Sequence, residues 1–208
     1  MSTAPRTPPK KKKHALSKEE QAQYVALDCE MVGVGHNCKS HIARVTMVNW
    51  DQEIVYDTFV RPAAPVTDYR TFVSGITSDD LDSDSAVDID TCRKQVSAML
   101  KGKILVGHAL KNDLVALGIQ HPWQCTRDTG KFEPFMKVRF DDGVLWPRKL
   151  KELVAEKLQR EIQCPGQPHS AFEDAAAALQ LYKLVRIKWE KTMQYKIQKT
   201  AQILQSQQ

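Results

Sequence analysis

The alternation of hydrophobic and polar residues predicts several extended segments. The segment YVALDC (24–29) has the apolar character of a strand, and IARVTMVNW (42–50) with EIVYDTFV (53–60) indicates a hairpin. Shorter runs predict two further strands, at ILV (104–106) and QCTRDT (124–129). The pattern therefore predicts a sheet of five strands.

Hydrophobic residues spaced three and four apart predict helices in the later part of the chain. These helices cover residues 91–102, 109–118, 148–159 and about 171–190. Residues 61–90 are rich in Pro, Ser and Asp, which indicates a loop with short helical turns. Early strands followed by helices that alternate with short strands predict an α/β fold, in which a mixed five-stranded sheet is flanked by helices.

Composition divides the chain into one folded domain and two tails. Residues 1–20 are rich in Pro and Lys, so we expect a disordered basic tail; residues 21–192 form the domain, and residues 193–208 a polar tail. Residues 1–13 hold five basic residues and no acid, and so account for the whole formal net charge of +5. Because the rest of the chain is neutral overall, we expect the protein to contact a phosphate-bearing substrate at one end rather than along its whole length.

Two classes of protein are disfavoured. The apolar runs are too short to cross a bilayer, so we expect no membrane partner. The five cysteines are odd in number and show no CxxC pairing, which favours a reducing compartment over a disulfide framework.

Two acidic residues stand at the end of the first predicted strand. Residues i and i+2 of a strand project from the same face, with Cα atoms about 6.6 Å apart. Asp28 and Glu30 can therefore converge on one cation, whereas Cys29 points to the opposite face. Two acids facing solvent at a strand end are an equally simple interpretation of this pair alone, but the apolar residues before them favour a semi-buried site.

A third acid lies in the second predicted helix. Leu110, Leu114 and Leu117 form its apolar stripe, and Asp113 flanks that stripe. A carboxylate in this position approaches the sheet and needs a partner, which a cation could provide. The position alone is also compatible with a side chain that reaches solvent.

The segment HSAFED (169–174) predicts a helix start that holds an imidazole beside a carboxylate. Ser170 and Glu173 fit the capping box S-x-x-E. His169 and Asp174 then occupy the two positions that meet in a hydrophobic staple, and the helix dipole favours an ionised carboxylate there. An exposed cap with incidental polar residues remains the alternative.

Together these segments supply four carboxylates and one histidine. Four carboxylates in one cleft repel each other unless cations are present, and two divalent ions would balance their charge. Oxygen ligands favour Mg²⁺ or Mn²⁺ over Zn²⁺. The set suits two-metal phosphodiester hydrolysis, in which an imidazole can accept the proton of the attacking water at neutral pH.

Several longer segments resemble a known family. ALDCEMVGVG (26–35), GHALKNDL (107–114) and HSAFEDA (169–175) resemble, in order, the three exonuclease motifs of the DEDDh superfamily. With VTDYRTFVSGI (66–76) and RDTGKFEPF (127–135), they look like the RNA exonuclease 4 group. The resemblance covers roughly residues 24–190 and implies a ribonuclease H-like fold.

The resemblance also implies a role for each residue. Asp28, Glu30 and Asp174 would hold the ion that activates water, Asp28 and Asp113 the second ion, and His169 would be the general base. The 3′-terminal nucleotide would lie against Met31 and Val32, and the products would be nucleoside 5′-monophosphates.

The expected function is a 3′→5′ exoribonuclease that acts on single-stranded RNA 3′ ends. Lys10 to Lys13 resemble a nuclear-localisation patch, so we expect a nuclear, nucleolar protein that takes part in rRNA processing on pre-ribosomal particles. Two alternatives remain: an exonuclease for single-stranded DNA, and a catalytically idle nucleic-acid-binding module in ribosome assembly. No residue in the sequence identifies the group that would recognise a 2′-hydroxyl.

Overall fold

A computed structural model describes residues 15–207, and in this range the main sheet is mixed. Its strands lie in the order β5-β3-β2-β1-β6-β7, and β4 pairs with the C-terminal end of β1. The pairs β1–β2, β2–β3 and β1–β4 are antiparallel, whereas β1–β6, β6–β7 and β3–β5 are parallel. The strands are β1 (Tyr24–Val34), β2 (Lys39–Val48), β3 (Ile54–Arg61), β4 (Val66–Asp68), β5 (Val87–Asp88), β6 (Ile104–Gly107) and β7 (Thr126–Asp128).

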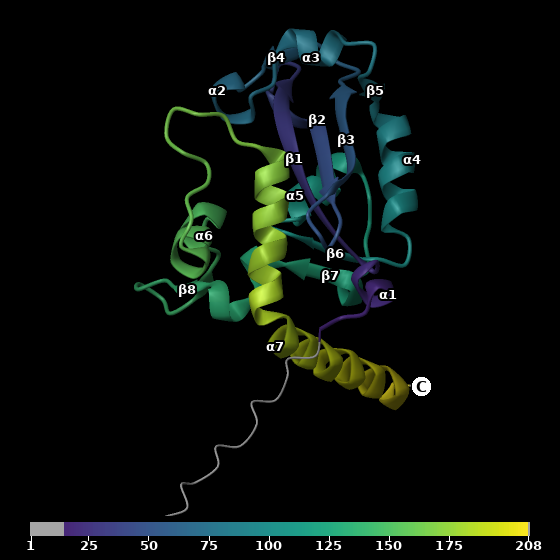
Figure 1. Ribbon diagram of the computed structural model, residues 1–208, viewed down its shortest axis with the longest axis vertical. Helices are drawn as coiled ribbons and strands as arrows, with labels where there is room; N and C mark the ends of the chain where they lie inside the picture. Colours follow the sequence, from purple (N-terminus) through teal and green to yellow (C-terminus); the bar gives the residue numbers. More distant parts are fainter. Residues whose placement is uncertain (1–14, 208) are drawn as a thin grey trace, which may run out of the picture.

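Helices cover both faces of this sheet (Figure 1). The α-helices are α1 (Lys18–Gln21), α2 (Thr71–Ser74), α3 (Ser78–Asp82), α4 (Ile89–Leu100), α5 (Lys111–Leu117), α6 (Leu150–Leu158) and α7 (Ala171–Ser206). Three 3₁₀ turns, η1 (Trp123–Cys125), η2 (Thr129–Lys131) and η3 (Glu133–Phe135), lead into a small separate hairpin of β8 (Lys137–Val138) and β9 (Leu145–Trp146). Among the described residues, no helix is both long and apolar enough to span a membrane.

Alternation along β1 divides the core between the two faces. Tyr24 and Ala26 join a cluster with α6 and α7, where the small residues of α7 bring that helix close to the sheet. Val25 and Leu27 point the other way, into a cluster with α4 and α5. The mixed sheet with flanking helices is thus as predicted, and β4 and β5 are short additions to the five expected strands.

The acidic stretch of residues 78–90 supplies helix caps. The Asp80 carboxylate accepts hydrogen bonds from the backbone and hydroxyl of Thr77, the residue before α3. Asp88 precedes α4, and one of its oxygens accepts the backbone N–H groups of Asp90 and Thr91 at 2.9 and 2.8 Å. These carboxylates satisfy N–H groups that a helix start leaves without partners.

The last helix is longer than the pattern predicts, because α7 continues to Ser206. Its second half turns away from the sheet (Figure 1), so the apolar period weakens beyond residue 190 although the backbone stays helical. The Thr192 hydroxyl donates to the carbonyl of Lys188 at 3.1 Å, a contact that often accompanies helix bending. At the N-terminal end, Lys18–Gln21 form a short helix with a complete capping box at Ser17, although residues 1–20 are expected to be disordered.

A buried ion pair holds α7 against β7 at this point. Arg127 is nearly inaccessible and donates two hydrogen bonds to the carboxylate of Glu190, at 2.7 and 2.8 Å. The Tyr182 hydroxyl donates to the same carboxylate at 2.7 Å. Because both oxygens of the Glu190 carboxylate accept hydrogen bonds from the planar guanidinium, the pair fixes the rotation of α7 about its axis.

Candidate active site

Strand β1 places two acids side by side at the centre of the sheet. Asp28 is half-buried and Glu30 is buried. Their neighbour Cys29 packs into the cluster on the opposite face, as the alternation predicts. The register between β1 and β2 shifts directly after Glu30, an irregularity that reorients side chains and is common beside active sites.

Helix α5 brings Asp113 to the same place. The chain turns from β6 into α5 at Gly107, where an added Cβ would lie 2.9 Å from the carbonyl oxygen of Leu27. The absence of a side chain therefore lets this turn approach β1 closely. Asp113 is buried. The structure thus places Asp113 against the sheet rather than in solvent.

The start of α7 supplies the fourth acid and the histidine. Ser170 is the N-cap, as predicted, and its hydroxyl accepts the backbone N–H of Glu173 at 3.3 Å. Only this half of the predicted capping box is present among the described residues, because the Glu173 side chain does not accept the backbone N–H of Ser170. The backbone N–H of His169 donates to the carbonyl of Val73 in α2 at 2.7 Å. Asp174 is buried and accepts a hydrogen bond from the Gln163 side chain at 2.7 Å.

The four carboxylates influence one another electrostatically. Burial, together with the charges of Asp113, Asp174 and Glu30, raises the pKa of Asp28 well above its ordinary value. Burial and the charge of Asp174 raise the pKa of Glu30 to about 7, although Arg44 opposes the shift.

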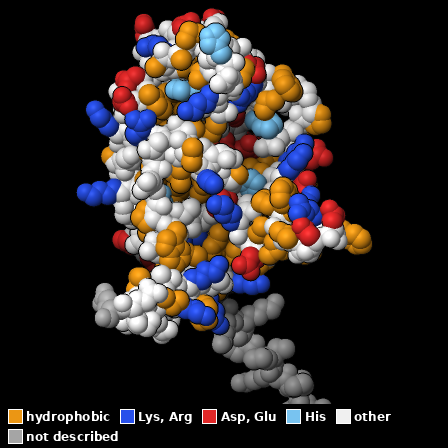
Figure 2. Space-filling view, turned by 180° about the vertical axis from the view of Figure 1, so that it is seen from behind, with side chains coloured by type: hydrophobic (Ala, Val, Ile, Leu, Met, Phe, Trp, Pro, Cys, Tyr) orange, Lys and Arg blue, Asp and Glu red, His pale blue; other side chains and the backbone are white. Residues whose placement is uncertain are grey.

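The same causes act on the other two acids. Burial and the charge of Asp128 raise the pKa of Asp113 to about 7. Burial raises the pKa of Asp174, while Gln163 and the charge of His169 lower it in part. The residues predicted as one constellation therefore lie within electrostatic reach of each other, and in the view of Figure 2 acidic side chains are visible at the bottom of a hollow.

The chemistry of these donors fits a cation site. Glu30 Oε1 and Asp174 Oδ1 are buried without a hydrogen-bond partner among the described residues, so each has lone pairs to offer. Acids that destabilise each other in this way are stabilised by a divalent cation. Within residues 15–207, however, no three His, Cys, Asp or Glu side chains are arranged, as they stand, to hold a metal ion. Ligation therefore requires these side chains to rotate or draw together.

The raised pKa values predict how stability depends on pH. The pKa of Glu30 is about 7 in the folded protein against an ordinary value of 4.5, so the folded state binds the proton more tightly. Its contribution to stability is complete below about pH 4.5 and is lost as the pH rises to about 7. In EDTA, the melting temperature of the wild type relative to Glu30→Gln should fall on the order of 5 °C over this range.

The matched measurement adds Mg²⁺ or Mn²⁺ in place of EDTA. Because cations displace protons from carboxylates, the rise in melting temperature that they cause should be larger near pH 7.5 than near pH 5.5. If the melting temperatures of wild type and Glu30→Gln in EDTA changed in parallel with pH, the raised pKa of Glu30 would be contradicted.

The two residues predicted to contact a nucleotide differ in their exposure to solvent. Met31 is half-buried and retains accessible surface. Val32 has 0% exposure and packs with Ala43, Ile76 and Leu81, so no atom of Val32 is accessible to a nucleotide in this structure.

The pattern did not identify several supporting residues. Gln163 lies in an irregular loop, with a φ of 52°, so no periodicity marked it. One oxygen of Asp128, at the end of β7, accepts the N–H groups of Ala109 and Gly130, and the charge of Asp128 also acts on Asp113. Arg44 makes a bidentate pair with Asp57 at 2.8 and 2.7 Å, which links β2 to β3.

Comparison with known proteins finds extended similarity. A family model described as Exonuclease (RNase_T) matches residues 25–182. RNA exonuclease 4 of Kluyveromyces lactis is 46% identical over 170 residues, which cover 81% of this chain and 55% of that protein. The human RNA exonuclease 4 is 45% identical over 167 residues, which cover 80% of this chain and 38% of that protein. The chain thus spans about half, or less, of the length of these relatives.

Solved structures confirm the architecture. The pseudoubiquitin hydrolase–RNA exonuclease module of Saccharomyces cerevisiae Pan2, determined with AAGGA RNA, superposes with a TM-score of 0.68 at 24% identity. The match covers 88% of this chain and 33% of that one. At this identity the likeness shows the fold, and it confirms the predicted ribonuclease H-like arrangement.

Proposed function

Because the chain belongs to the exonuclease family whose model matches residues 25–182, we propose that it is a 3′→5′ exoribonuclease releasing nucleoside 5′-monophosphates. The relatives confirm the resemblance to the RNA exonuclease 4 group that the motifs indicate. One observation carries the proposal: β1, α5 and α7 bring four carboxylates together, so that the charges of the other three raise the pKa of Asp28, and a histidine at the start of α7 acts on Asp174.

Exonuclease domains of this family use divalent metal ions. We propose two ions, Mg²⁺ or Mn²⁺, held by Asp28, Glu30, Asp113 and Asp174, since these side chains offer only oxygen donors. Such ions, when bound, stabilise charge on the phosphate oxygens and lower the pKa of water.

The chain's own residues would then handle the proton and the substrate's position. His169 would accept the proton of the attacking water at an imidazole nitrogen. The charge of His169 lowers the pKa of Asp174, and the Asp174 carboxylate would in turn keep the imidazole oriented. Gln163 would hold Asp174 in turn. Met31 would contact the terminal nucleotide.

Substrate and location follow from the relatives and from the basic segment. The names of the relatives state an RNA exonuclease, and we propose single-stranded RNA 3′ ends as the substrate. We further propose a nuclear, nucleolar protein that trims rRNA on pre-ribosomal particles. This last proposal rests on residues 1–13, which lie outside the described residues.

Parallel time courses on a matched pair of RNA and DNA oligonucleotides test the function. With 3′-labelled substrate and Mg²⁺ or Mn²⁺, labelled mononucleotide should appear from the first time point and faster from RNA. A clear preference for DNA would favour the single-stranded DNA exonuclease. Tight, metal-dependent binding without turnover of either strand would instead indicate the idle binding module.

A further inference from the structure

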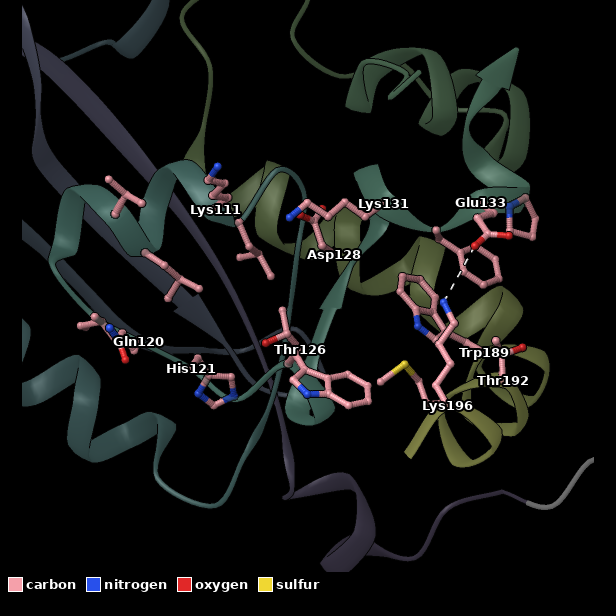
Figure 3. Close-up of a pocket in the computed structure, with 18 of the residues that line it drawn as sticks. Lys111, Gln120, His121, Thr126, Asp128, Lys131, Glu133, Trp189, Thr192 and Lys196 are labelled. Carbon is pink, nitrogen blue, oxygen red and sulfur yellow. Dashed lines mark ion pairs between the residues drawn. The ribbon is translucent and has the colours of Figure 1, made fainter. Parts of the chain in front are cut away.

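A pocket of about 870 Å³ lies beside the four carboxylates rather than over them. Its walls come from α5, from the η1–β7 and η2–η3 segments, and from α7 where that helix turns away from the sheet (Figure 3). The pocket and the carboxylate site share a wall, because Asp128 lines the pocket and its charge acts on Asp113. The volume is typical of a small-molecule or nucleotide site.

Phe132, Trp189 and Trp123 line this pocket, and of these three only Trp123 is exposed. Phe132 stacks on Trp189, with ring centroids 4.2 Å apart and an interplanar angle of 10°. Trp123 also lines the pocket and is 46% exposed, so part of its ring is accessible. Exposed aromatic rings beside cations are the surfaces on which unpaired nucleobases stack.

The charged residues of the pocket favour an anion. Four lysines line it, against two acids. Lys196 lies 3.9 Å from one of these acids, Glu133, and Figure 3 shows Lys111 and Lys131 on one side of the pocket with Lys196 across from them. The fourth lysine is Lys188 on α7. Lysines spread round an aromatic pocket are complementary to the phosphates of a strand.

An unsatisfied acceptor completes the site. Asp128 is only 6% exposed, and one carboxylate oxygen accepts the backbone N–H groups of Ala109 and Gly130. The other oxygen, Oδ2, has no partner among the described residues. Buried carboxylate oxygens are rarely left unpaired, and the amino group of a nucleobase is a suitable donor.

We propose that this pocket binds an upstream nucleotide of the RNA strand whose 3′ end occupies the carboxylate site. The inference rests on the proposed exonuclease function and adds a second point of attachment for the same substrate. Trp123 stacks on the base, and the lysines contact its phosphates. Short substrates that end within the carboxylate site cannot reach it, so the pocket's contribution depends on substrate length.

Steady-state kinetics on two RNA lengths test the proposal. For a 12-nucleotide RNA, Trp123→Ala should raise KM roughly tenfold, the expected effect of losing one base–aromatic stack. Lys188→Glu should also raise KM and reduce its dependence on salt. Neither change should alter kcat/KM for a dinucleotide.

Two variants control for fold and surface charge. Trp146→Ala removes an exposed tryptophan outside the pocket, and Lys191→Glu makes the same charge change on α7 outside the pocket. Both should leave KM on the 12-nucleotide RNA unchanged. If KM is also unchanged in Trp123→Ala and Lys188→Glu while the wild type is active, the pocket proposal is overturned.

Two further outcomes are distinguishable. If wild type releases no mononucleotide from either RNA, the exonuclease function itself has failed. If added uridine monophosphate inhibits wild type but not Trp123→Ala, while KM for the 12-nucleotide RNA is equal in both, the pocket takes free nucleotides and the strand subsite is wrong.

Discussion

Replacing Asp28 with Asn is expected to lower kcat for RNA hydrolysis by at least about 10³-fold, since losing a cation ligand removes several kcal/mol of transition-state stabilisation. Asp28 is the residue assigned to both cations, and it receives the charges of Asp113, Asp174 and Glu30. Asn keeps the shape of the side chain and removes its charge. The loss of activity should therefore occur without loss of the fold.

The same substitution should stabilise the metal-free protein. Burial and three neighbouring acids disfavour a charge at position 28, so a neutral amide relieves repulsion in EDTA. Thermal melts should show Asp28→Asn at or above the wild-type melting temperature in EDTA, and a smaller rise than wild type on adding Mn²⁺.

Asp141→Asn serves as the control, because Asp141 is exposed in the loop of the β8–β9 hairpin. It should change neither kcat nor the response to Mn²⁺. Near-normal kcat in Asp28→Asn, with stability retained, would remove Asp28 from the mechanism.

Replacing His169 with Ala is expected to lower kcat about 10²–10⁴-fold, the usual contribution of a general base. The four carboxylates are unchanged in this variant, so the rise in melting temperature caused by Mn²⁺ should persist. This pattern differs from that of Asp28→Asn, in which kcat falls and the rise in melting temperature caused by Mn²⁺ becomes smaller as well.

His36→Ala is the matched control, since His36 is exposed in the loop between β1 and β2. It should retain full activity. A His169→Ala variant with wild-type kcat would show that another group, or bulk water, accepts the proton.

The placement of the site could be predicted where local rules determine it. Alternation in β1 places Asp28 beside Glu30, and the cap at Ser170 places Asp174 in the first turns of α7. These relations hold within one element and need no knowledge of the rest of the chain. For Asp113 the helical position left two outcomes open, and the close turn at Gly107 decided between them.

The remaining features depend on contacts between distant segments. Gln163 reaches Asp174 from an irregular loop, and Arg127 meets Glu190 from 63 residues away. The pocket is formed by segments that no periodic pattern relates. The extension of α7 was missed because, beyond residue 190, the helix no longer packs on the sheet and so has no continuous apolar stripe to reveal it.

The proposed metal ligands and the proposed base differ in local stability. Asp28 and Glu30 belong to β1, where both pair with β2, and β6 pairs with the same strand at residues 24–26. The amides of this central strand should therefore exchange with solvent only when a large part of the sheet opens. His169 precedes its helix, and among the described residues one backbone hydrogen bond joins it to α2, a helix of four residues. Fraying of that attachment requires far less free energy than opening the sheet. Moderate heating should therefore abolish turnover at temperatures where the amides of β1 are still protected from hydrogen exchange and cations still bind.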